Sequence, residues 1–476
     1  MRIAMVAAEC EPFAKTGGLA DVVDALARAL GQLGHAVDVY LPAYRGVQPP
    51  AGATSLAFEL PTIDSATAHV RLLSAPVNGY RLRLVDYPPF FDRADYYVGD
   101  DGRDHPDNGA RFALLGRAAL EAMRIEGSVV DVLHGHDWHA APAILLLRHR
   151  HRRPPGMASI GTLLTCHNLA YHGWVPRAAV ASQLDLPADV GARAGVDLLR
   201  EGILAADLVN TVSPTYALES RQPGGGAGLE DALGSLGDRY FGIINGLDTA
   251  LWDPATDAAL AARYSADDPS GKDACRAALC DELGLDGAGP IAAMVSRLDP
   301  QKGFDLVAAA APRLLELGLR LVVLGTGDRR LVDGLRELAA ARPSLVALEE
   351  RFDRNLARRI YAGADLFLMP SRFEPCGQGQ MIALRYGTLP VVRATGGLAD
   401  TIVDADARPA TGNGFSFGQA TPDALVAACR RAAAALADPA RRTLLIERAM
   451  RIDHSWARPA ADYVAAYERA VALAAR

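Results

Sequence analysis

The stretch IAAMVSRLDPQKGFDLVAAAAPRLLELG, residues 291–318, joins the two kinds of element that predict the fold. It begins with a short apolar run of the kind that forms a buried parallel strand. A polar turn follows, and a helical pattern then continues to a glycine, the residue that commonly ends a helix. A strand that leads through a polar turn into a helix is the repeating unit of a doubly wound α/β sheet.

The same alternation runs through both halves of the chain. Candidate strands lie at 3–9, 37–42, 81–87, 131–138, 161–168 and 207–213, and then at 291–297, 319–325, 345–350, 365–371 and 389–395. Because there are two such series, we expect an α/β fold with two Rossmann-like doubly wound domains facing a cleft. We place these domains at 1–248 and 249–457. The helix expected at 458–476 follows all the strands, so it could pack on either domain, including back on the N-terminal one.

Composition excludes several classes of protein. The chain has 476 residues, half of them hydrophobic, and a formal net charge of -7, which argues against nucleic acid as a partner because phosphate contacts need a basic face. No apolar stretch reaches the roughly 20 residues of a membrane helix, so we expect no membrane partner. Six cysteines are scattered without a CxxC pair, which favours a reducing compartment and a cytoplasmic protein.

A glycine turn before a helix occurs twice, as KTGGLADVVDAL at 15–26 and as ATGGLADTIVDA at 394–405. Helix N-termini present unpaired N–H groups and positive partial charge, so such turns suit anions. Glycines let the backbone approach a ligand closely, and Lys15 adds a positive charge to the first copy only. The alternative for the first copy is a tight turn with a solvated lysine.

A second cationic motif, SRLDPQKGFDL at 296–306, follows a buried strand directly. It places Arg297 and Lys302 at the carboxyl end of that strand, where open α/β sheets bind ligands. Two such cations suit a diphosphate, because each close charge pair is worth about 4 kcal/mol at an effective dielectric constant of 20. A solvated charged loop is the alternative.

The turn after the strand at 365–371 adds a carboxylate, Glu374, and backbone N–H groups at 377–380. A carboxylate accepts hydrogen bonds from sugar hydroxyls, so its place near a phosphate site suggests a nucleotide-sugar; the alternative is a helix N-terminal charge. The motif GTGDRR at 325–330 has an arginine where a dinucleotide fingerprint has its third glycine. An NAD site is therefore not favoured, and this turn is interpreted as another that lines the nucleotide.

Three histidines, at 134, 136 and 139, invite a metal interpretation, but no cysteine or HExxH arrangement accompanies them. We favour a polar crevice in which Asp137, His167 and Asn168 meet a sugar while Trp138 and Trp174 supply flat surfaces for its rings. Buried, hydrogen-bonded histidines are the alternative.

Together these motifs resemble the bacterial glycogen synthase, or starch synthase, family, and they occur in the family's order along almost the whole chain. The motifs are KTGGLADV, HGHDWHAAP, HNLAYHGW, VSPTYALE, GLEDAL, IINGLD, SRLDPQKGFDL, SRFEPCGQGQ, TGGLADT and DHSW. The resemblance implies the two-domain GT-B architecture, with acceptor and catalytic groups on the N-terminal domain and the nucleotide-sugar on the C-terminal one. It implies retaining transfer of glucose from ADP-glucose to the non-reducing 4-hydroxyl end of an α-1,4-glucan, in glycogen biosynthesis. No metal and no cofactor are expected.

The resemblance also implies two sets of site residues. The catalytic set is Arg297, Lys302, Glu374, His167 and Asp137. The substrate-binding set is Lys15, Gly17, Gly18, Asn168, Asn245, Cys376, Gly377, Thr395, Gly396 and Gly397. The cations would stabilise the departing diphosphate, and Glu374 would bind glucose hydroxyls. His167 and Asn245 would contact the transferred glucose or the acceptor end. No protein nucleophile is evident, which agrees with same-face attack in which the departing phosphate takes the acceptor proton.

The chain departs from the family at EPCGQGQ, where EPCGLTQ is usual, so Gln378 and Gly379 replace a leucine and a threonine. This change removes a hydroxyl that could bind phosphate and leaves the nucleotide preference open. A related GT-B transferase that uses UDP-glucose or another acceptor is therefore one alternative. A non-catalytic two-lobed sugar-binding protein is the other, although it would not need the cations at 15, 297 and 302.

Overall fold

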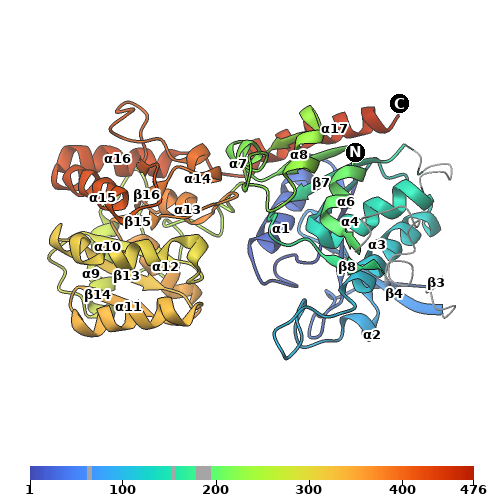
Figure 1. Cartoon of the computed structure of the whole chain (residues 1–476), viewed down its shortest axis with the longest axis horizontal. Coiled ribbons are helices and arrows are strands. Elements are labelled where there is room, and N and C mark those ends of the chain that lie inside the picture. The colour runs from blue at the N-terminus through green and yellow to red at the C-terminus, as the bar shows by residue number, and fades with distance from the viewer. Residues whose placement is uncertain (62–66, 152–156, 158, 178–194, 476) are drawn as a thin grey trace. The chain divides into compact units, whose positions relative to one another are not determined.

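The computed structural model describes residues 1–61, 67–151, 157, 159–177 and 195–475, which form two compact units (Figure 1). Unit 1 is Met1–Gly246 together with Trp456–Arg476, and unit 2 is Leu247–Ser455. The chain therefore passes from unit 1 to unit 2 and back again. Each crossing lies two residues before the boundary expected from the sequence.

Unit 1 is built on a nine-stranded sheet with the order β11-β10-β7-β6-β1-β2-β5-β4-β3, in which only β4 runs opposite to the other strands. Its strands are β1 (Arg2–Val6), β2 (Ala36–Pro42), β3 (Thr54–Pro61), β4 (Thr67–Val77), β5 (Tyr80–Asp86), β6 (Val132–His136), β7 (Gly161–Cys166), β10 (Leu208–Thr211) and β11 (Tyr240–Gly242). A separate two-stranded sheet pairs β8 (Trp174–Pro176) with β9 (Gly195–Asp197).

The search for continuous apolar runs does not detect strands β3 and β4, because exposed and buried residues alternate along β4. Such alternation belongs to an antiparallel pair with one exposed face, whereas continuous apolar runs indicate only strands that are covered on both faces. Strands β6, β7 and β10 are buried at every residue, as parallel strands covered on both faces should be.

Helices of unit 1 cover the sheet. They are α1 (Gly18–Gln32), α2 (Pro88–Phe91), α3 (Asn108–Ile125), α4 (Asp137–Leu146), α6 (Leu198–Ala205), α7 (Pro214–Glu219), α8 (Glu230–Ser235) and α17 (Ala457–Ala474). The last of these, α17, packs on β6, β7 and α1, so the end of the chain completes the core of unit 1.

Unit 2 has a wholly parallel sheet in the order β14-β13-β12-β15-β16-β17, which is the strand order of a Rossmann domain. Its strands are β12 (Ile291–Val295), β13 (Arg320–Leu324), β14 (Val346–Glu349), β15 (Leu366–Met369), β16 (Leu389–Arg393) and β17 (Phe415–Phe417). Its helices are α9 (Gly271–Leu283), α10 (Phe304–Glu316), α11 (Arg329–Ala341), α12 (Arg354–Gly363), α13 (Gly379–Arg385), α14 (Gly396–Thr401), α15 (Pro422–Ala437) and α16 (Pro439–Arg451). The expected doubly wound α/β class is confirmed.

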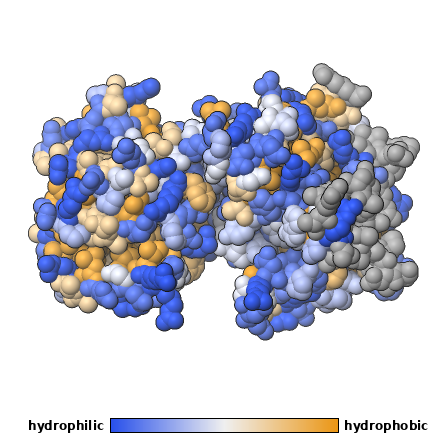
Figure 2. Space-filling model, in the orientation of Figure 1, coloured by the Kyte–Doolittle hydropathy of each residue, from blue (hydrophilic) through white to orange (hydrophobic). Residues whose placement is uncertain are grey.

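Hydrophilic residues are spread over the visible face of each unit (Figure 2), because outer helices such as α11 bury only a narrow apolar stripe. All six cysteines are buried thiols. Among the described residues, no helix is long and apolar enough to cross a membrane.

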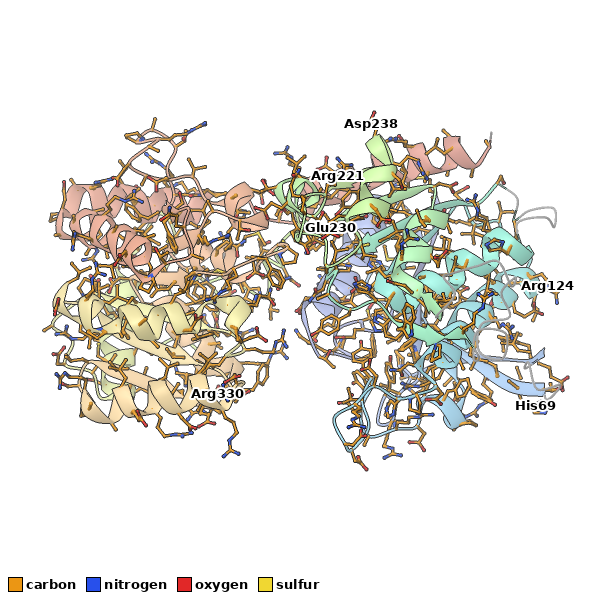
Figure 3. All side chains as sticks on the ribbon, viewed as in Figure 1. His69, Arg124, Arg221, Glu230, Asp238 and Arg330 are labelled. Atoms are coloured by element: carbon orange, nitrogen blue, oxygen red, sulfur yellow. The ribbon has the colours of Figure 1, made fainter. Side chains whose placement is uncertain are left out.

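The glycine-rich segment 221–240 contains α8, and hydrogen bonds join its two ends. Arg221, labelled in Figure 3, donates to the carbonyl oxygens of Gly237 and Tyr240, each at 2.7 Å. The Glu230 carboxylate accepts from the Gly226 N–H at 3.1 Å. These bonds join side chains of the segment to backbone groups of the same segment.

The contact between α17 and β7 can be tested at Gly161, where an added Cβ would lie 2.7 Å from backbone atoms of Ala470 and Val471. We expect Gly161→Ala to lower the free energy of unfolding of unit 1 by about 1–3 kcal/mol, the usual cost of overpacking. Gly234→Ala is the matched control, because a Cβ added at Gly234 would have no atom within 4 Å. Thermal unfolding of both variants tests this, and equal unfolding temperatures would contradict the packing.

Candidate functional site

Both units place expected site residues where the strand order reverses. In unit 2, β12 and β15 are neighbours whose connections leave in opposite directions; Arg297 and Lys302 follow β12, and Glu374 follows β15. In unit 1 the corresponding neighbours are β1 and β6; Lys15 follows β1 and Asp137 follows β6. Open α/β sheets bind ligands in the crevice at the carboxyl ends of such strands, so each unit brings its expected site residues to the edge of the sheet where such folds bind ligands.

Lys302 and Glu374 form the centre of the unit 2 site. The Lys302 ammonium donates to the Glu374 carboxylate at 2.7 Å, and the Ser371 hydroxyl donates to the same oxygen at 3.0 Å. Glu374 is only 4% exposed, so these two bonds balance a buried charge. Ser371 was not predicted from the sequence, although it ends the strand that leads to Glu374.

Arg297 lies beside the GTGDRR turn and is exposed. Among the described residues its guanidinium has no hydrogen-bond or ion-pair partner, although its backbone carbonyl accepts from the Ser296 hydroxyl at 3.2 Å. Its neighbour Leu298 donates its N–H to the Thr326 carbonyl at 2.9 Å and accepts from the Asp328 N–H at 2.8 Å. A Cβ at Gly327 would lie 2.2 Å from the Leu298 carbonyl oxygen, so this glycine permits the close approach of the two loops. The structure thus brings the GTGDRR turn next to the Arg297 loop.

The second TGGLAD turn packs tightly against the turn that contains Glu374. A Cβ at Gly396 would lie 2.0 Å from the Glu374 carbonyl oxygen, and one at Gly397 would lie 2.1 Å from the Cys376 carbonyl oxygen. The Gly397 N–H already donates to the Glu374 carbonyl at 3.1 Å. The N–H of Gly397, a residue of the expected substrate-binding set, therefore joins two turns in this structure. The buried Thr395 is the N-cap residue of α14.

The departure at EPCGQGQ has a steric basis in unit 2. A Cβ at Gly379 would lie 2.9 Å from Cε1 of Phe367, so an unshifted Phe367 ring leaves no room for a threonine there. Gly377 has φ 72°, and the buried Gln380 amide donates to the Gly377 and Cys376 carbonyl oxygens at 3.1 Å each. The turn is therefore held by its own side chains.

In unit 1, the first glycine turn is held by Glu9, a residue that the sequence motifs did not indicate. The Glu9 carboxylate accepts from the Thr16 N–H and hydroxyl, each at 2.6 Å, from the Gly17 N–H at 3.0 Å and from the Tyr97 hydroxyl at 2.6 Å. The sequence does contain one signal for Glu9, which is a charged residue at the end of the candidate strand 3–9. In contrast to the second turn, nothing lies within 4 Å of a Cβ built on Gly17 or Gly18.

Lys15 pairs locally in this structure. Its ammonium lies 2.5 Å from Asp21 Oδ1 and 3.5 Å from Glu11 Oε2, and its side chain is 30% exposed. Pairs with this exposure are worth little, so the lysine can exchange its partners for a ligand anion at small cost.

Asp137 joins the ends of β6 and β7. Its Oδ1 accepts from the backbone N–H of His167 at 2.6 Å and of Asn168 at 3.4 Å. Its φ of 57° is unusual for a residue with a side chain, and such strain persists only where the surroundings impose it. Burial raises the pKa of Asp137 to about 7, against the opposing effect of the two N–H donors. Asp137, His167 and Asn168 are thus brought together as expected.

Histidines at the ends of β6 and β7 pair with each other and with hydroxyls. His136 Nδ1 lies 3.0 Å from His167 Nε2, and His134 contacts the hydroxyls of Tyr467 and Thr165 at 2.9 Å and 2.7 Å. Burial lowers the pKa of His167 to about 3. No group of three potential metal ligands occurs among the residues that the structure describes.

Two further expectations concern exposure. Trp138 was expected to present a flat surface to sugar, but it is 7% exposed and its ring contacts that of His139, with centroids 4.0 Å apart and planes 30° apart. Trp174, by contrast, is 54% exposed. Asn245 is 5% exposed, and its Oδ1 has no hydrogen-bond partner among the described residues, so it retains an acceptor for a ligand.

Comparison with protein families gives two matches. The family described as starch synthase catalytic domain matches residues 2–235, and glycosyl transferases group 1 match residues 277–451. The matched ranges lie in unit 1 and unit 2 respectively.

Full-length relatives and solved structures are similar to the chain. The glycogen synthase of Syntrophotalea carbinolica is 41% identical over 99% of both chains, and that of Anaeromyxobacter dehalogenans strain 2CP-C is 43% identical over 98% of this chain and 99% of its own. The catalytic domain of starch synthase IV from Arabidopsis thaliana, solved with ADP and acarbose, is 35% identical with a TM-score of 0.88 over 99% of both chains. The sucrose-phosphate synthase of Thermosynechococcus elongatus, 18% identical with a TM-score of 0.60 over 99% of both chains, shares the fold.

The buried Asp137 carboxyl gives a pH-dependent test. Its pKa is about 7 in the folded protein against an ordinary value of 3.8, so between these pH values the folded state keeps a proton that the unfolded state has lost. Wild-type stability therefore falls as pH rises through this window. Asp137→Asn keeps an acceptor oxygen but does not titrate, so its free energy of unfolding relative to wild type should rise by about 3 kcal/mol between pH 5 and pH 8. Urea unfolding at both pH values measures this; a difference that does not change with pH contradicts it.

Proposed function

We propose substrates for this chain on the premise that it belongs to the glycogen synthase and starch synthase family and is a glucosyltransferase of the GT-B fold. The resemblance noted in the sequence is confirmed by these full-length matches. The donor is ADP-glucose, and glucose is transferred with retention to the non-reducing 4-hydroxyl end of an α-1,4-glucan such as glycogen. The observation that carries the choice of donor is the 35% identity to a starch synthase solved with ADP and acarbose.

The unit 2 site supplies the charges that a nucleotide-sugar needs. The Arg297 guanidinium is exposed without a partner among the described residues, and the Lys302 ammonium has donors beyond the one that binds Glu374. We assign both cations to the diphosphate, where they stabilise negative charge as the bond from the anomeric carbon to oxygen breaks and its electron pair leaves with the phosphate. Glu374 accepts hydrogen bonds from glucose hydroxyls.

The acceptor 4-hydroxyl attacks the anomeric carbon on the face from which the diphosphate departs. Its proton passes to an oxygen of the leaving phosphate, so no protein nucleophile takes part. Unit 1 supplies the polar contacts for glucose and the acceptor end: His167 and Asn168 at the end of β7, Asp137 behind them, and the Asn245 acceptor oxygen. Lys15, with Gly17 and Gly18, is assigned to the donor phosphate or sugar.

The six buried thiols suit a reducing compartment, and we place the protein in the cytoplasm. Glucan extension from an activated sugar nucleotide is consistent with that location.

Incubation of the purified protein with glycogen and either ADP-glucose or UDP-glucose tests the donor. We expect ADP release with matching incorporation of glucose, and a kcat/KM for ADP-glucose at least about tenfold above that for UDP-glucose, the scale of a few specific contacts. Preference for UDP-glucose would overturn the donor, and no extension with either nucleotide would overturn the substrate assignment as a whole.

Arg297 and Lys302 should matter for turnover and little for folding. Removal of one electrostatic stabiliser of a leaving group typically lowers kcat by about 10²–10³-fold, and we expect this for Arg297→Ala and for Lys302→Gln. Lys302→Gln keeps a donor for the buried Glu374 carboxylate. Arg430→Ala, at an exposed position on α15, is the control and should leave kcat unchanged. Near-normal glucan extension by an Arg297→Ala variant whose unfolding temperature matches wild type would contradict the role assigned to Arg297.

A further inference from the structure

Three histidine rings stand in a row inside unit 1, and the middle one has a nitrogen without a partner. The ring centroids of His134 and His136 are 4.1 Å apart, and those of His136 and His167 are 5.3 Å apart with the planes 25° from parallel. His136 is fully buried. Its Nδ1 meets His167 Nε2 at 3.0 Å, whereas its Nε2 has no hydrogen-bond partner among the described residues. A buried polar atom of this kind calls for an explanation.

The first ring of the row is held by a chain of hydrogen bonds that leads to α17. The Thr165 hydroxyl donates to Asn210 Oδ1 at 2.7 Å, so it must accept from His134 Nε2, 2.7 Å away. His134 Nδ1 then accepts from the Tyr467 hydroxyl at 2.9 Å, and the Asn210 amide donates to the Tyr463 hydroxyl at 3.2 Å. Because the Thr165 hydroxyl donates to Asn210, this network fixes the tautomer of His134 and gives His136 a rigid neighbour.

The hydrogen bond between His136 Nδ1 and His167 Nε2 contains one proton, which belongs to one of the two rings. Burial lowers the pKa of His136 well below its ordinary value and that of His167 to about 3, so both rings are neutral, each with one N–H and one lone pair. If His167 Nε2 carried the proton between them, His136 would be left with a buried N–H that donates to nothing. If His136 Nδ1 carries it, His136 Nε2 is only an unused acceptor. Orphaned buried N–H groups are the rarer of the two, so His136 is the donor.

We propose that His136 is a positioning residue that holds His167 as the tautomer with its proton on Nδ1, so that His167 donates a hydrogen bond to a sugar hydroxyl. This inference rests on the proposed function, which places His167 against the transferred glucose or the acceptor end. His167 Nε2 is occupied by His136, so Nδ1 is the ring nitrogen that remains for substrate. The row of histidines thus orients a substrate contact, and α17 supports the far end of the row.

Paired substitutions at His136 separate positioning from packing. The side-chain amide of His136→Asn can place an N–H close to the position of Nδ1, whereas His136→Leu fills a similar volume without a donor. We expect His136→Leu to lower kcat about 10- to 100-fold and His136→Asn to stay within about fivefold of wild type, the scale of a lost or kept polar contact in the transition state. A packing role predicts the reverse order, because a buried site tolerates leucine better than asparagine. A higher kcat for His136→Leu than for His136→Asn, measured at a temperature where both variants are folded, overturns the proposal.

A double-mutant cycle then asks whether His136 acts through His167. In a His167→Ala background the further effect of His136→Leu should shrink to less than about twofold, because coupled residues are not additive. If His167→Ala lowers activity and His136→Leu keeps its full effect in that background, the inference fails while the proposed function stands. If His167→Ala extends glycogen normally, the proposed role of His167 fails and the inference with it.

A measurement on the unmutated protein gives an independent readout of the tautomer. In ¹⁵N NMR of protein labelled with ¹⁵N-histidine, the signals of His167 are those that disappear in His167→Ala. We expect these signals to show a protonated Nδ1 and an unprotonated Nε2. A protonated Nε2 on His167 overturns the proposal whatever the kinetics of the variants.

Discussion

Burial of parallel strands on both faces is the constraint from which the rest of the structure follows. Strands such as β6, β7 and β10 have no exposed residue, so polar side chains appear where these strands end. Parallel strands end at a common edge, and the reversal of strand order opens a crevice there. In unit 1 this edge gathers the groups around Asp137 and His167, and in unit 2 it gathers Arg297, Lys302 and Glu374. The chemistry of each unit is therefore a consequence of how its sheet is covered.

The repeated TGGLAD turn shows that one sequence can be used for two physical reasons. Glycine is needed at 396 and 397 because a Cβ there would clash with the backbone oxygens of Glu374 and Cys376. The Gly397 N–H donates to the Glu374 carbonyl. The space around Gly17 and Gly18 is open, and the Glu9 carboxylate stabilises the turn by accepting a hydrogen bond from the Gly17 N–H. Packing thus requires the glycines of the second turn, whereas the space around the glycines of the first turn is open.

Charge in both sites is arranged before substrate arrives. Lys302 and Ser371 satisfy the buried Glu374 carboxylate, and backbone N–H groups satisfy Asp137. Such prior ordering is what electrostatic stabilisation of a transition state requires, since polar groups that are already oriented need not reorganise. The role proposed for His136 extends the same principle to a side chain that orients another side chain through one hydrogen bond.

The sequence by itself determined the elements that local pattern encodes: the strands that form continuous apolar runs, the polar turns after them, the cations at 297 and 302, and the family. Only the tertiary structure decided what depends on contacts between distant residues. The alternating hairpin of β3 and β4, the docking of α17 on β7, the burial of Trp138 and the pairing of His136 with His167 are of this kind. So is the ring of Phe367 that makes Gly379 the residue that fits. Periodicity reports which face of an element is apolar, whereas a partner far along the chain is chosen only when the elements pack.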